Sequence, residues 1–358
     1  MKTIMLTLTE RCNLNCTYCY EKNKSLRTMA KETAIKILEK ELQEDVDFCE
    51  IQFFGGEPFF EYDLMKELCE FLWSKEWPVK YHCFVTTNGT LVHGEVQQWL
   101  KENREKIICS LSLDGNKNAH DINRCNSFDL IDIDFFKETW PLQTAKMTIS
   151  PESLPFLAES VIYLHEQGIK FDNNLAYGVN WNDKKLVRIM EEQLAKIADY
   201  YILHPQVEPC RMLNMSLENV LTKEKAPRWC GAGISLRAFD VEGNVFPCHL
   251  FEGMSMEKEL SDGIKKIDFS KEIKMDSMCE KCPIYNVCPT CYGHNYLATG
   301  DITKRDEDLC QFTKLNTLVA SYIWLQRIKK YSFAELNIEK EKYLRLYVAA
   351  EKIQKELK

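Results

Sequence analysis

The 358-residue sequence predicts an α/β protein in which a partial, TIM-like (β/α)6 barrel is followed by a small cysteine-rich domain and C-terminal helices. Three observations support this prediction. Short β-rich runs alternate with segments of helical periodicity up to about residue 180. Seven cysteines punctuate residues 230–310, and helical periodicity returns after Cys310. An open doubly wound sheet is the alternative arrangement of the first half.

Six strands are predicted in this half, because β-branched, aromatic and aliphatic residues dominate six runs bounded by turn-forming residues. These runs are residues 4–8, 49–54, 81–87, 107–113, 145–150 and 173–179. Helical spacing of apolar residues predicts helices over 29–44, 63–75, 95–105 and 154–168. Strands that alternate with helices pair in parallel through right-handed crossovers, and this order favours the barrel.

The second half is less regular. A predicted helix over 182–204 precedes a stretch in which periodicity fades and prolines suit a linker. The segment beyond Cys230 carries little continuous apolar sequence, so we expect it to fold around metal. Helical patterns return over 313–331 and 333–357. The expected domains are the barrel at 1–205, a linker at 206–229, the cysteine-rich domain at 230–310 and helices at 311–358.

The composition narrows the function classes. A formal net charge of -8 and the lack of a Lys/Arg-rich run argue against nucleic acid as a partner, since duplex binding needs clustered positive charge. No stretch approaches the ~20 apolar residues of a membrane helix, and no secretory signal is present, so we expect a cytoplasmic protein without membrane contact. In that reducing compartment, 16 cysteines indicate metal ligands rather than disulfides.

A cysteine loop directly follows the first predicted strand, with Cys12, Cys16 and Cys19 in C-x3-C-x2-C spacing. Three thiolates in so short a span can hold three irons of a cubic cluster and leave the fourth iron open for chemistry. A zinc knuckle is the alternative. Structural zinc usually takes four protein ligands, and no fourth Cys or His lies nearby in the sequence.

Further motifs follow the next three predicted strands: FFGGEPFF, TTNGT and SLSLDG, the last followed by HDINR. Polar residues at the C-terminal ends of parallel strands lie where barrel and open-sheet active sites lie. Taken singly, each motif also fits a turn, a strand end or a solvated charge. Together with the cysteine loop, they make residues 2 to about 180 resemble the radical SAM enzymes.

This resemblance implies a [4Fe-4S] cluster that binds S-adenosylmethionine and yields a 5'-deoxyadenosyl radical, which abstracts a substrate hydrogen. Tyr18 would contact the adenine, Gly56 and Glu57 the methionyl ammonium, Ser112 the ribose and Arg124 the carboxylate. The full set of implied cofactor-binding residues is Tyr18, Gly55, Gly56, Glu57, Asn88, Ser112, Asp114 and Arg124.

The later cysteines resemble the SPASM extension, which carries two auxiliary iron-sulfur clusters. Cys230 precedes a G-x4-C motif that ends at Cys248, and a C-x2-C-x5-C-x2-C run, one residue shorter than usual before its last cysteine, precedes Cys310. The resemblance gives a distal cluster Cys279, Cys282, Cys288 and Cys310, and a second cluster Cys230, Cys248 and Cys291. The chain would thus hold three [4Fe-4S] clusters.

The second auxiliary cluster would have an open iron, because Leu236 stands where relatives that fill the site supply another cysteine. Recruitment of Cys210 from the linker is the alternative, and a zinc ribbon remains an alternative for the C-x2-C pairs. His249 follows Cys248 at the position of the catalytic aspartate of sulfatase-maturating relatives. It is the candidate catalytic residue, as a proton relay, with a hydrogen-bonding role beside the cluster as the alternative.

SPASM relatives mostly modify peptides, so the resemblance implies a peptide substrate. An open auxiliary iron could bind a cysteine thiolate of that peptide, which favours a maturase that forms a thioether crosslink. Formylglycine formation, as in sulfatase maturation, is one alternative, and a noncatalytic metal-binding scaffold is another. Expected partners are a Cys-containing peptide and a flavodoxin- or ferredoxin-type electron donor. Since Cys12 leaves no room for a leader-binding module before it, leader recognition would come from a separate leader-binding protein or from the C-terminal helices.

Overall fold

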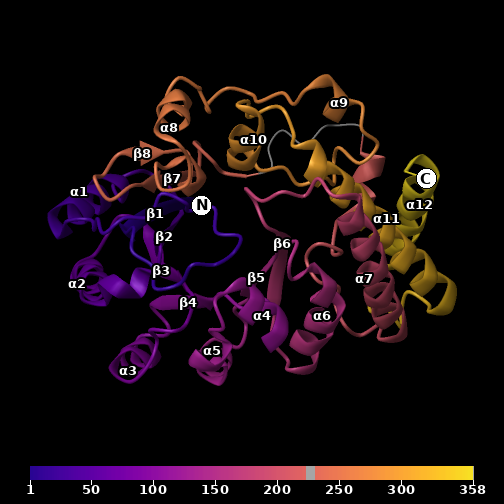
Figure 1. Cartoon of the computed structure of the whole chain (residues 1–358), viewed down its shortest axis with the longest axis horizontal. Coiled ribbons are helices and arrows are strands. Elements are labelled where there is room, and N and C mark those ends of the chain that lie inside the picture. Colours follow the sequence, from indigo (N-terminus) through magenta and orange to yellow (C-terminus); the bar gives the residue numbers. More distant parts are fainter. Residues whose placement is uncertain (223–229, 358) are drawn as a thin grey trace. The chain divides into compact units, whose positions relative to one another are not determined.

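The computed structural model describes residues 1–222 and 230–357. These residues form two compact units (Figure 1). The first unit contains Met1–Leu113, Arg124–Lys146 and Cys230–Glu272. The second contains Asp114–Asn123, Met147–Trp229 and Ile273–Lys358.

A six-stranded sheet organises the first unit, in the order β4-β3-β2-β1-β7-β8. Neighbouring strands are parallel, apart from the antiparallel pair β7 and β8. The strands are β1 (Lys2–Thr9), β2 (Phe48–Gly55), β3 (Lys80–Thr87), β4 (Ile107–Leu111), β7 (Leu236–Phe239) and β8 (Val245–Phe246). The parallel strand-helix order confirms the α/β prediction.

Strands β7 and β8 were not expected, because they come from the cysteine-rich segment. β7 is only LRAF, too short for periodicity to reveal, yet it pairs in parallel with β1 from Thr3↔Leu236 to Leu6↔Phe239. Its Ala238 and Phe239 are buried. This part of the segment therefore adds to an apolar core as well as carrying cysteines.

Alternating residues of the sheet build that core. In β2, Cys49, Ile51 and Phe53 are buried, whereas the residues between them are partly exposed. Helices lie along one side of the sheet in Figure 1 and bury leucines of their own, such as Leu38 and Leu68. The helices of this unit are α1 (Lys31–Glu41), α2 (Tyr62–Trp73), α3 (Glu95–Glu102), α5 (Ile133–Thr139) and α8 (Lys258–Ile264), with 3-10 turns η1 (Pro58–Glu61), η2 (Phe128–Leu130) and η5 (His249–Phe251).

A buried ion-pair network joins the start of β1 to the end of α1. Lys2 Nζ lies 2.6 Å from Glu41 Oε2 and 2.9 Å from Glu44 Oε2, and Arg237 Nη1 lies 2.9 Å from Glu41 Oε2. The Lys2 and Glu41 side chains are only 4% and 3% exposed. Each charge is therefore stable in the core only while its partner is present.

Replacing Glu41 by alanine is expected to destabilise the fold by about 3 kcal/mol, because Lys2 would keep only the half-exposed Glu44 as a charged partner, besides the backbone carbonyl of residue 41. The midpoint of urea unfolding measures this change. Glu39→Ala is the matched control: Glu39 pairs with Lys75 on the surface and should cost about 0.5 kcal/mol or less. Equal midpoints for the two variants would contradict the assignment of the buried network.

The strand series continues from β4 into β5 (Ala145–Ile149) through a parallel bridge between Ser112 and Lys146. β5 then pairs with β6 (Phe171–Leu175). All six predicted strands are thus present in the expected order, and the parallel pairing of β1 to β4 agrees with the predicted partial barrel.

Helices make up most of the second unit. They are α4 (Lys117–Asn123), α6 (Leu157–Glu166), α7 (Lys184–Leu203), α9 (Ser277–Glu280), α10 (Tyr292–Thr299), α11 (Glu307–Lys330) and α12 (Lys340–Glu356), with η3 (Leu154–Phe156) and η4 (Leu217–Leu221). α11 packs against both α7 and α12. Its Arg327 donates from Nε and Nη2 to the carbonyl of Tyr201, which caps the last turn of α7.

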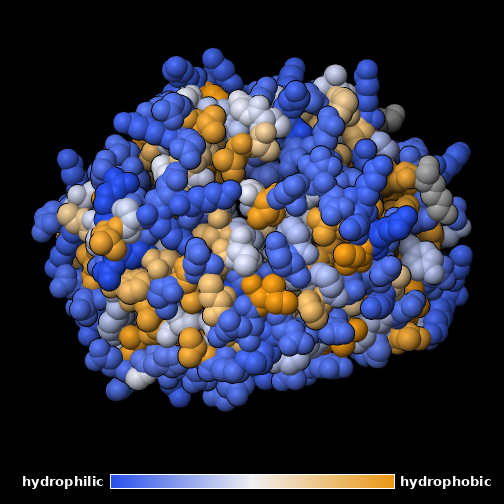
Figure 2. Space-filling model, viewed as in Figure 1, coloured by the Kyte–Doolittle hydropathy of each residue, from blue (hydrophilic) through white to orange (hydrophobic). Residues whose placement is uncertain are grey.

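α11 begins before the predicted helix. The Asp306 side chain accepts a hydrogen bond from Asp308 N and caps the new start, so Cys310 lies in the first turn. Polar side chains cover most of the face seen in Figure 2, with apolar residues in small groups. Within the described residues, every helix is too short or too polar to span a membrane.

Candidate active site and metal centres

The cysteine loop after β1 is held by backbone and side-chain bonds from neighbouring loops. Gly56 N donates to Thr9 O at 3.0 Å, and Glu57 N donates to Arg11 O at 2.7 Å. These bonds join the C-terminal ends of β1 and β2. Cys12, Cys16 and Cys19 are all partly exposed, so the loop presents three accessible thiols within one short segment.

A third loop reaches the same segment from the end of β3. Asn13 donates to Thr90 Oγ1 at 2.7 Å and accepts from Asn88 Nδ2 at 2.9 Å. Burial raises the pKa of the Cys12 and Cys19 thiols, with Lys24 opposing the shift. Because metal ligation requires thiolates, bound iron would release these protons. The donor set therefore fits a cluster held by three cysteines.

The two glycines that end β2 are required by this close approach of backbones. A Cβ on Gly55, where φ is +150°, would lie 2.3 Å from Thr9 O. A Cβ on Gly56 would lie 2.3 Å from Arg11 O and 3.0 Å from Cys12 Cβ. Both glycines thus let the β2 end touch the cysteine loop.

Gly56→Ala is expected to displace Arg11 and the adjoining Cys12, and so to remove most iron from the N-terminal loop. Iron and acid-labile sulfide are counted after anaerobic reconstitution. Gly253→Ala is the control in the same unit, because a Cβ there meets no atom within 4 Å. Full iron content in Gly56→Ala would show that the loop tolerates the shift.

Glu57 is a buried acid at the centre of this group, with 1% of its surface exposed. Its carboxylate accepts hydrogen bonds from Thr87 Oγ1 at 2.7 Å, Asn88 N at 2.8 Å and Phe59 N at 3.2 Å. Burial raises the pKa of Glu57 to about 6, and these hydrogen bonds together with Arg124 oppose the rise. The carboxyl group is therefore poised to ionise when a cation arrives.

Arg124 and Tyr18 are also brought together. The guanidinium carbon of Arg124 lies 5.4 Å from the centre of the Tyr18 ring, and both residues are 8% exposed. The two residues after Arg124 have left-handed backbones, with φ of 57° at Cys125 and 55° at Asn126. The Cys125 thiol donates to Asn15 O at 3.1 Å, which ties this turn to the cysteine loop. Such costly conformations persist where the surroundings enforce them.

Two further predicted cofactor-binding residues, Ser112 and Asp114, also contact other parts of the protein. Ser112 is 8% exposed and forms the bridge to β5. Asp114, in the second unit, accepts from Asn123 Nδ2 at 3.0 Å and from Thr148 N at 2.8 Å. These bonds fix α4 against the end of β5.

His249 lies in an apolar setting beside Cys248 in the first unit. Its ring centre is 4.7 Å from that of Phe54 and 5.7 Å from that of Tyr20. Burial lowers the pKa of His249 to about 4, so the ring is neutral near pH 7. Its Nδ1 is buried and has no hydrogen-bond partner among the described residues.

Two buried acids near His249 and Tyr20, Glu252 and Glu21, were not predicted as site residues from the sequence. Glu252 is 1% exposed and accepts from Thr7 Oγ1 at 2.8 Å. Burial raises the pKa of Glu252 well above its ordinary value and that of Glu21 to about 8. Their positions, two residues after Cys19 and four after Cys248, were the only available signals.

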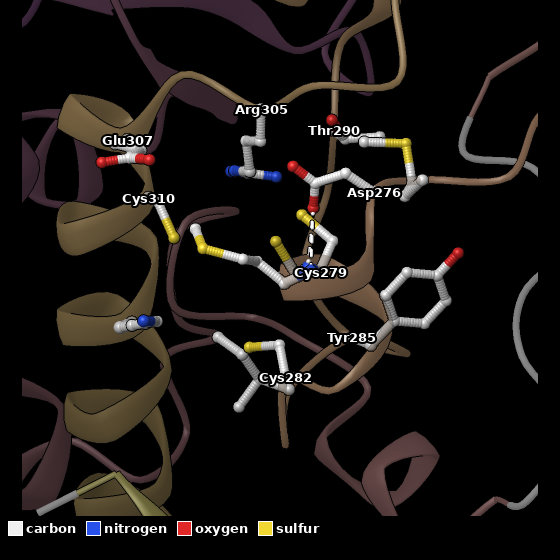
Figure 3. A pocket seen from close by; sticks show the side chains of 13 residues that line it. Asp276, Cys279, Cys282, Tyr285, Thr290, Arg305, Glu307 and Cys310 are labelled. Carbon is white, nitrogen blue, oxygen red and sulfur yellow. Dashed lines mark hydrogen bonds between the residues drawn. The ribbon is translucent and has the colours of Figure 1, made fainter.

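A cavity of about 330 Å³ in the second unit is lined by four cysteines (Figure 3). They are Cys279, Cys282, Cys288 and Cys310. We call it the distal cavity. Cys310 reaches it from α11, and Cys279 reaches it from α9, whose first turn is capped by Asp276. Burial raises the pKa of Cys279 and of Cys288 to about 11.

These thiols surround a volume and do not converge on a point. Across residues 1–222 and 230–357, no three His, Cys, Asp or Glu side chains meet closely enough to hold a single metal ion. A zinc ion draws its sulfur ligands to about 2.3 Å, whereas a cluster binds each thiolate through a separate iron. Four thiols around one cavity fit the predicted cluster.

The remaining predicted ligands fall in both units. Cys230 is exposed and Cys248 buried in the first unit. In the second unit, Cys291 caps α10 by accepting from His294 N at 3.5 Å. Cys210 is buried there, and its backbone N donates to Tyr201 Oη at 2.8 Å.

Comparison with known families decides the class of the N-terminal part. Residues 6–132 match the model of the radical SAM superfamily. These residues form a radical SAM domain. The superfamily implies a [4Fe-4S] cluster, and the matched residues contain the cysteine loop and the Glu57 and Arg124 sites.

Several relatives of this radical SAM enzyme have descriptive names. It is 21% identical over 353 residues to the radical SAM cyclopropyl synthase TigE of Paramaledivibacter caminithermalis, covering 88% of this chain and 73% of TigE. It is 24% identical over 321 residues to the cysteine-type anaerobic sulfatase-maturating enzyme of Clostridium perfringens, covering 77% and 84%. It is 26% identical over 325 residues to the subtilosin biosynthesis protein AlbA of Bacillus subtilis, covering 80% and 66%.

A solved structure shares the fold over nearly the whole radical SAM enzyme. Native anSMEcpe with bound AdoMet aligns with a TM-score of 0.68 at 18% identity, covering 89% of this chain and 97% of that chain. A second structure of anSMEcpe, with AdoMet and the Cp18Cys peptide, has the same TM-score. The shared fold therefore extends well past the 6–132 match.

Proposed function

We propose that this radical SAM enzyme is a peptide maturase that reductively cleaves S-adenosylmethionine and abstracts hydrogen from a Cys-containing peptide, forming a thioether. The distal cavity carries the proposal, because its four cysteines could hold a second metal centre besides the one at the N-terminal loop. Relatives named for sulfatase maturation, cyclopropyl synthesis and subtilosin biosynthesis support a peptide substrate.

At the N-terminal site, Cys12, Cys16 and Cys19 would hold the cluster. The ionised Glu57 would bind the methionyl ammonium beside Gly55 and Gly56, while Arg124 would bind the carboxylate. Tyr18, Asn88, Ser112 and Asp114 complete the proposed contacts to adenine and ribose. When bound, the cluster and S-adenosylmethionine supply a 5'-deoxyadenosyl radical, with the electron coming from a flavodoxin- or ferredoxin-type donor.

Two auxiliary clusters would accompany the cluster of the N-terminal loop. The four cysteines of the distal cavity would hold one, and Cys230, Cys248 and Cys291 would hold the other. With three protein thiolates, that second cluster keeps an iron for the substrate cysteine. Cys210 is the competing fourth ligand.

His249 bears on the choice between reactions. His249 stands where sulfatase-maturating relatives carry the aspartate of formylglycine formation. Burial lowers the pKa of His249 to about 4, so its ring is neutral near pH 7 and lacks the negative charge of a carboxylate. Its unpartnered Nδ1 can accept a hydrogen bond from substrate. The missing carboxylate supports thioether formation, in which the peptide loses two hydrogens and gains one sulfur-carbon bond.

Formylglycine formation is the second candidate, favoured by the fold shared with anSMEcpe and by the similarity to the Clostridium perfringens enzyme. Mass spectrometry of a Cys-containing peptide after anaerobic turnover separates the two. Loss of two hydrogens with the thiol unreactive to iodoacetamide supports the thioether. Loss of the sulfur atom supports formylglycine, and turnover that leaves every thiol free and the peptide mass unchanged contradicts both.

A further inference from the structure

Arg305 is the one arginine among the described residues that line the distal cavity. It directly precedes the capping residue of α11, and Figure 3 shows its guanidinium pointing into the cavity, near Asp276 and Cys279. Arginine keeps its charge under all protein conditions, so this residue places a permanent positive charge beside the four thiols.

Two hydrogen bonds fix that charge. Arg305 Nη1 donates to Pro289 O at 2.5 Å, and Nη2 donates to Thr313 Oγ1 at 2.9 Å. Pro289 directly follows Cys288, and Thr313 lies three residues after Cys310 on α11. The guanidinium therefore ties together two segments that carry cavity cysteines.

The third side-chain nitrogen of Arg305, Nε, indicates that the cavity binds a ligand. Its Nε is buried and has no acceptor within the described part of the chain. A buried donor left without an acceptor costs about 1–3 kcal/mol. A sulfur atom of a group bound in the cavity can supply the missing acceptor.

Three other charged side chains line the distal cavity: Asp276, Glu307 and Lys314. Asp276 Oδ1 accepts from the backbone N of Met278 and Cys279, so it is engaged in capping α9. Glu307 and Lys314 are exposed on α11, where solvent screens their charges. Burial raises the pKa of Cys288 and the Arg305 charge opposes that rise; at Cys279, burial and the Asp276 charge raise the pKa and Arg305 lowers it.

We infer that Arg305 is a positioning residue that holds its charge and its Nε donor against the cluster of the distal cavity and raises that cluster's reduction potential. This rests on the auxiliary cluster of the proposed function. A reduced cluster carries one more negative charge than an oxidised one, so a fixed positive charge and a hydrogen bond to sulfur favour the reduced form.

The test is an EPR-monitored redox titration of the full chain. Cys12, Cys16, Cys19, Cys230 and Cys248 are replaced by serine, so that only the distal cavity keeps its complete cysteine set. R305Q in this background is expected to lower the ratio of reduced to oxidised cluster about tenfold at a fixed potential, a shift of about 59 mV. R305K, which keeps the charge, should shift it less, and R188Q, at an exposed arginine of α7, should leave it unchanged.

An R305Q chain with full iron and the parent's potential would overturn the inference. If R305Q loses iron, T313V decides, because it removes one of the two bonds that hold the guanidinium without removing the charge: a lowered potential supports the inference and an unchanged one overturns it. The cluster itself is tested separately by Cys279→Ala with Cys282→Ala. Unchanged iron and sulfide in that variant would refute the auxiliary cluster, whatever Arg305 does.

Discussion

Replacing Cys16 by alanine is expected to reduce 5'-deoxyadenosine formation to an undetectable level, while iron bound by the later cysteines remains. The loop offers three thiols, and removing one leaves two thiolates for a cluster that already lacks a fourth protein ligand. The measurements are iron and sulfide counting after anaerobic reconstitution, and chromatography of 5'-deoxyadenosine after addition of a strong reductant.

Cys69→Ala is the matched control, since Cys69 is a fully buried thiol on α2 of the same unit. It should cost stability through a cavity in the core but keep 5'-deoxyadenosine formation. A Cys16→Ala chain that produces 5'-deoxyadenosine at the parent's rate would remove the cysteine loop from the proposed chemistry.

Glu57→Gln is expected to raise the KM for S-adenosylmethionine about 100-fold, because breaking a buried charge pair costs about 2–5 kcal/mol. Glutamine keeps the shape, and its amide oxygen can still accept from Thr87 Oγ1 and Phe59 N, although the bond from Asn88 N to the other carboxylate oxygen is lost, so the fold should persist. Steady-state 5'-deoxyadenosine formation at varied S-adenosylmethionine measures the effect.

The same acid predicts a pH dependence. Burial raises the pKa of Glu57 to about 6, and only its ionised form pairs with an ammonium group. Binding should therefore be strong above pH 6 and weaken as the pH falls through that value. In Glu57→Gln this dependence should disappear.

Glu252→Gln is the control for both Glu57 effects. Burial raises the pKa of Glu252 well above its ordinary value, and glutamine can still accept the hydrogen bond from Thr7 Oγ1, so this substitution should change the KM little. Equal effects of the two substitutions would show that Glu57 acts only as part of the core.

Sequence alone predicted elements whose signal is local. The six strands of the barrel appear where β-rich runs indicated them. The resemblance to the SPASM extension grouped Cys279, Cys282 and Cys288 with Cys310, and all four line the distal cavity. Strand β7 was missed, because four residues are too few for a periodic signal.

Contacts between residues far apart in the sequence could not be predicted. Thr7 and Glu252 share a buried hydrogen bond across 245 residues, and no spacing in the sequence relates them. Likewise, Arg305 could not be singled out before its contacts with Pro289 and Thr313 were known. Which residues surround a polar group, and hence its charge state, depends on tertiary packing.

The pairing of β1 with β7 has a consequence for biosynthesis. During translation β1 emerges from the ribosome first, yet one of its edges stays unpaired until Leu236–Phe239 has been made. Unpaired edges invite aggregation, and distant pairings form slowly. Newly made chains should therefore depend on chaperones, and metal loading of the first cysteines should follow completion of the polypeptide.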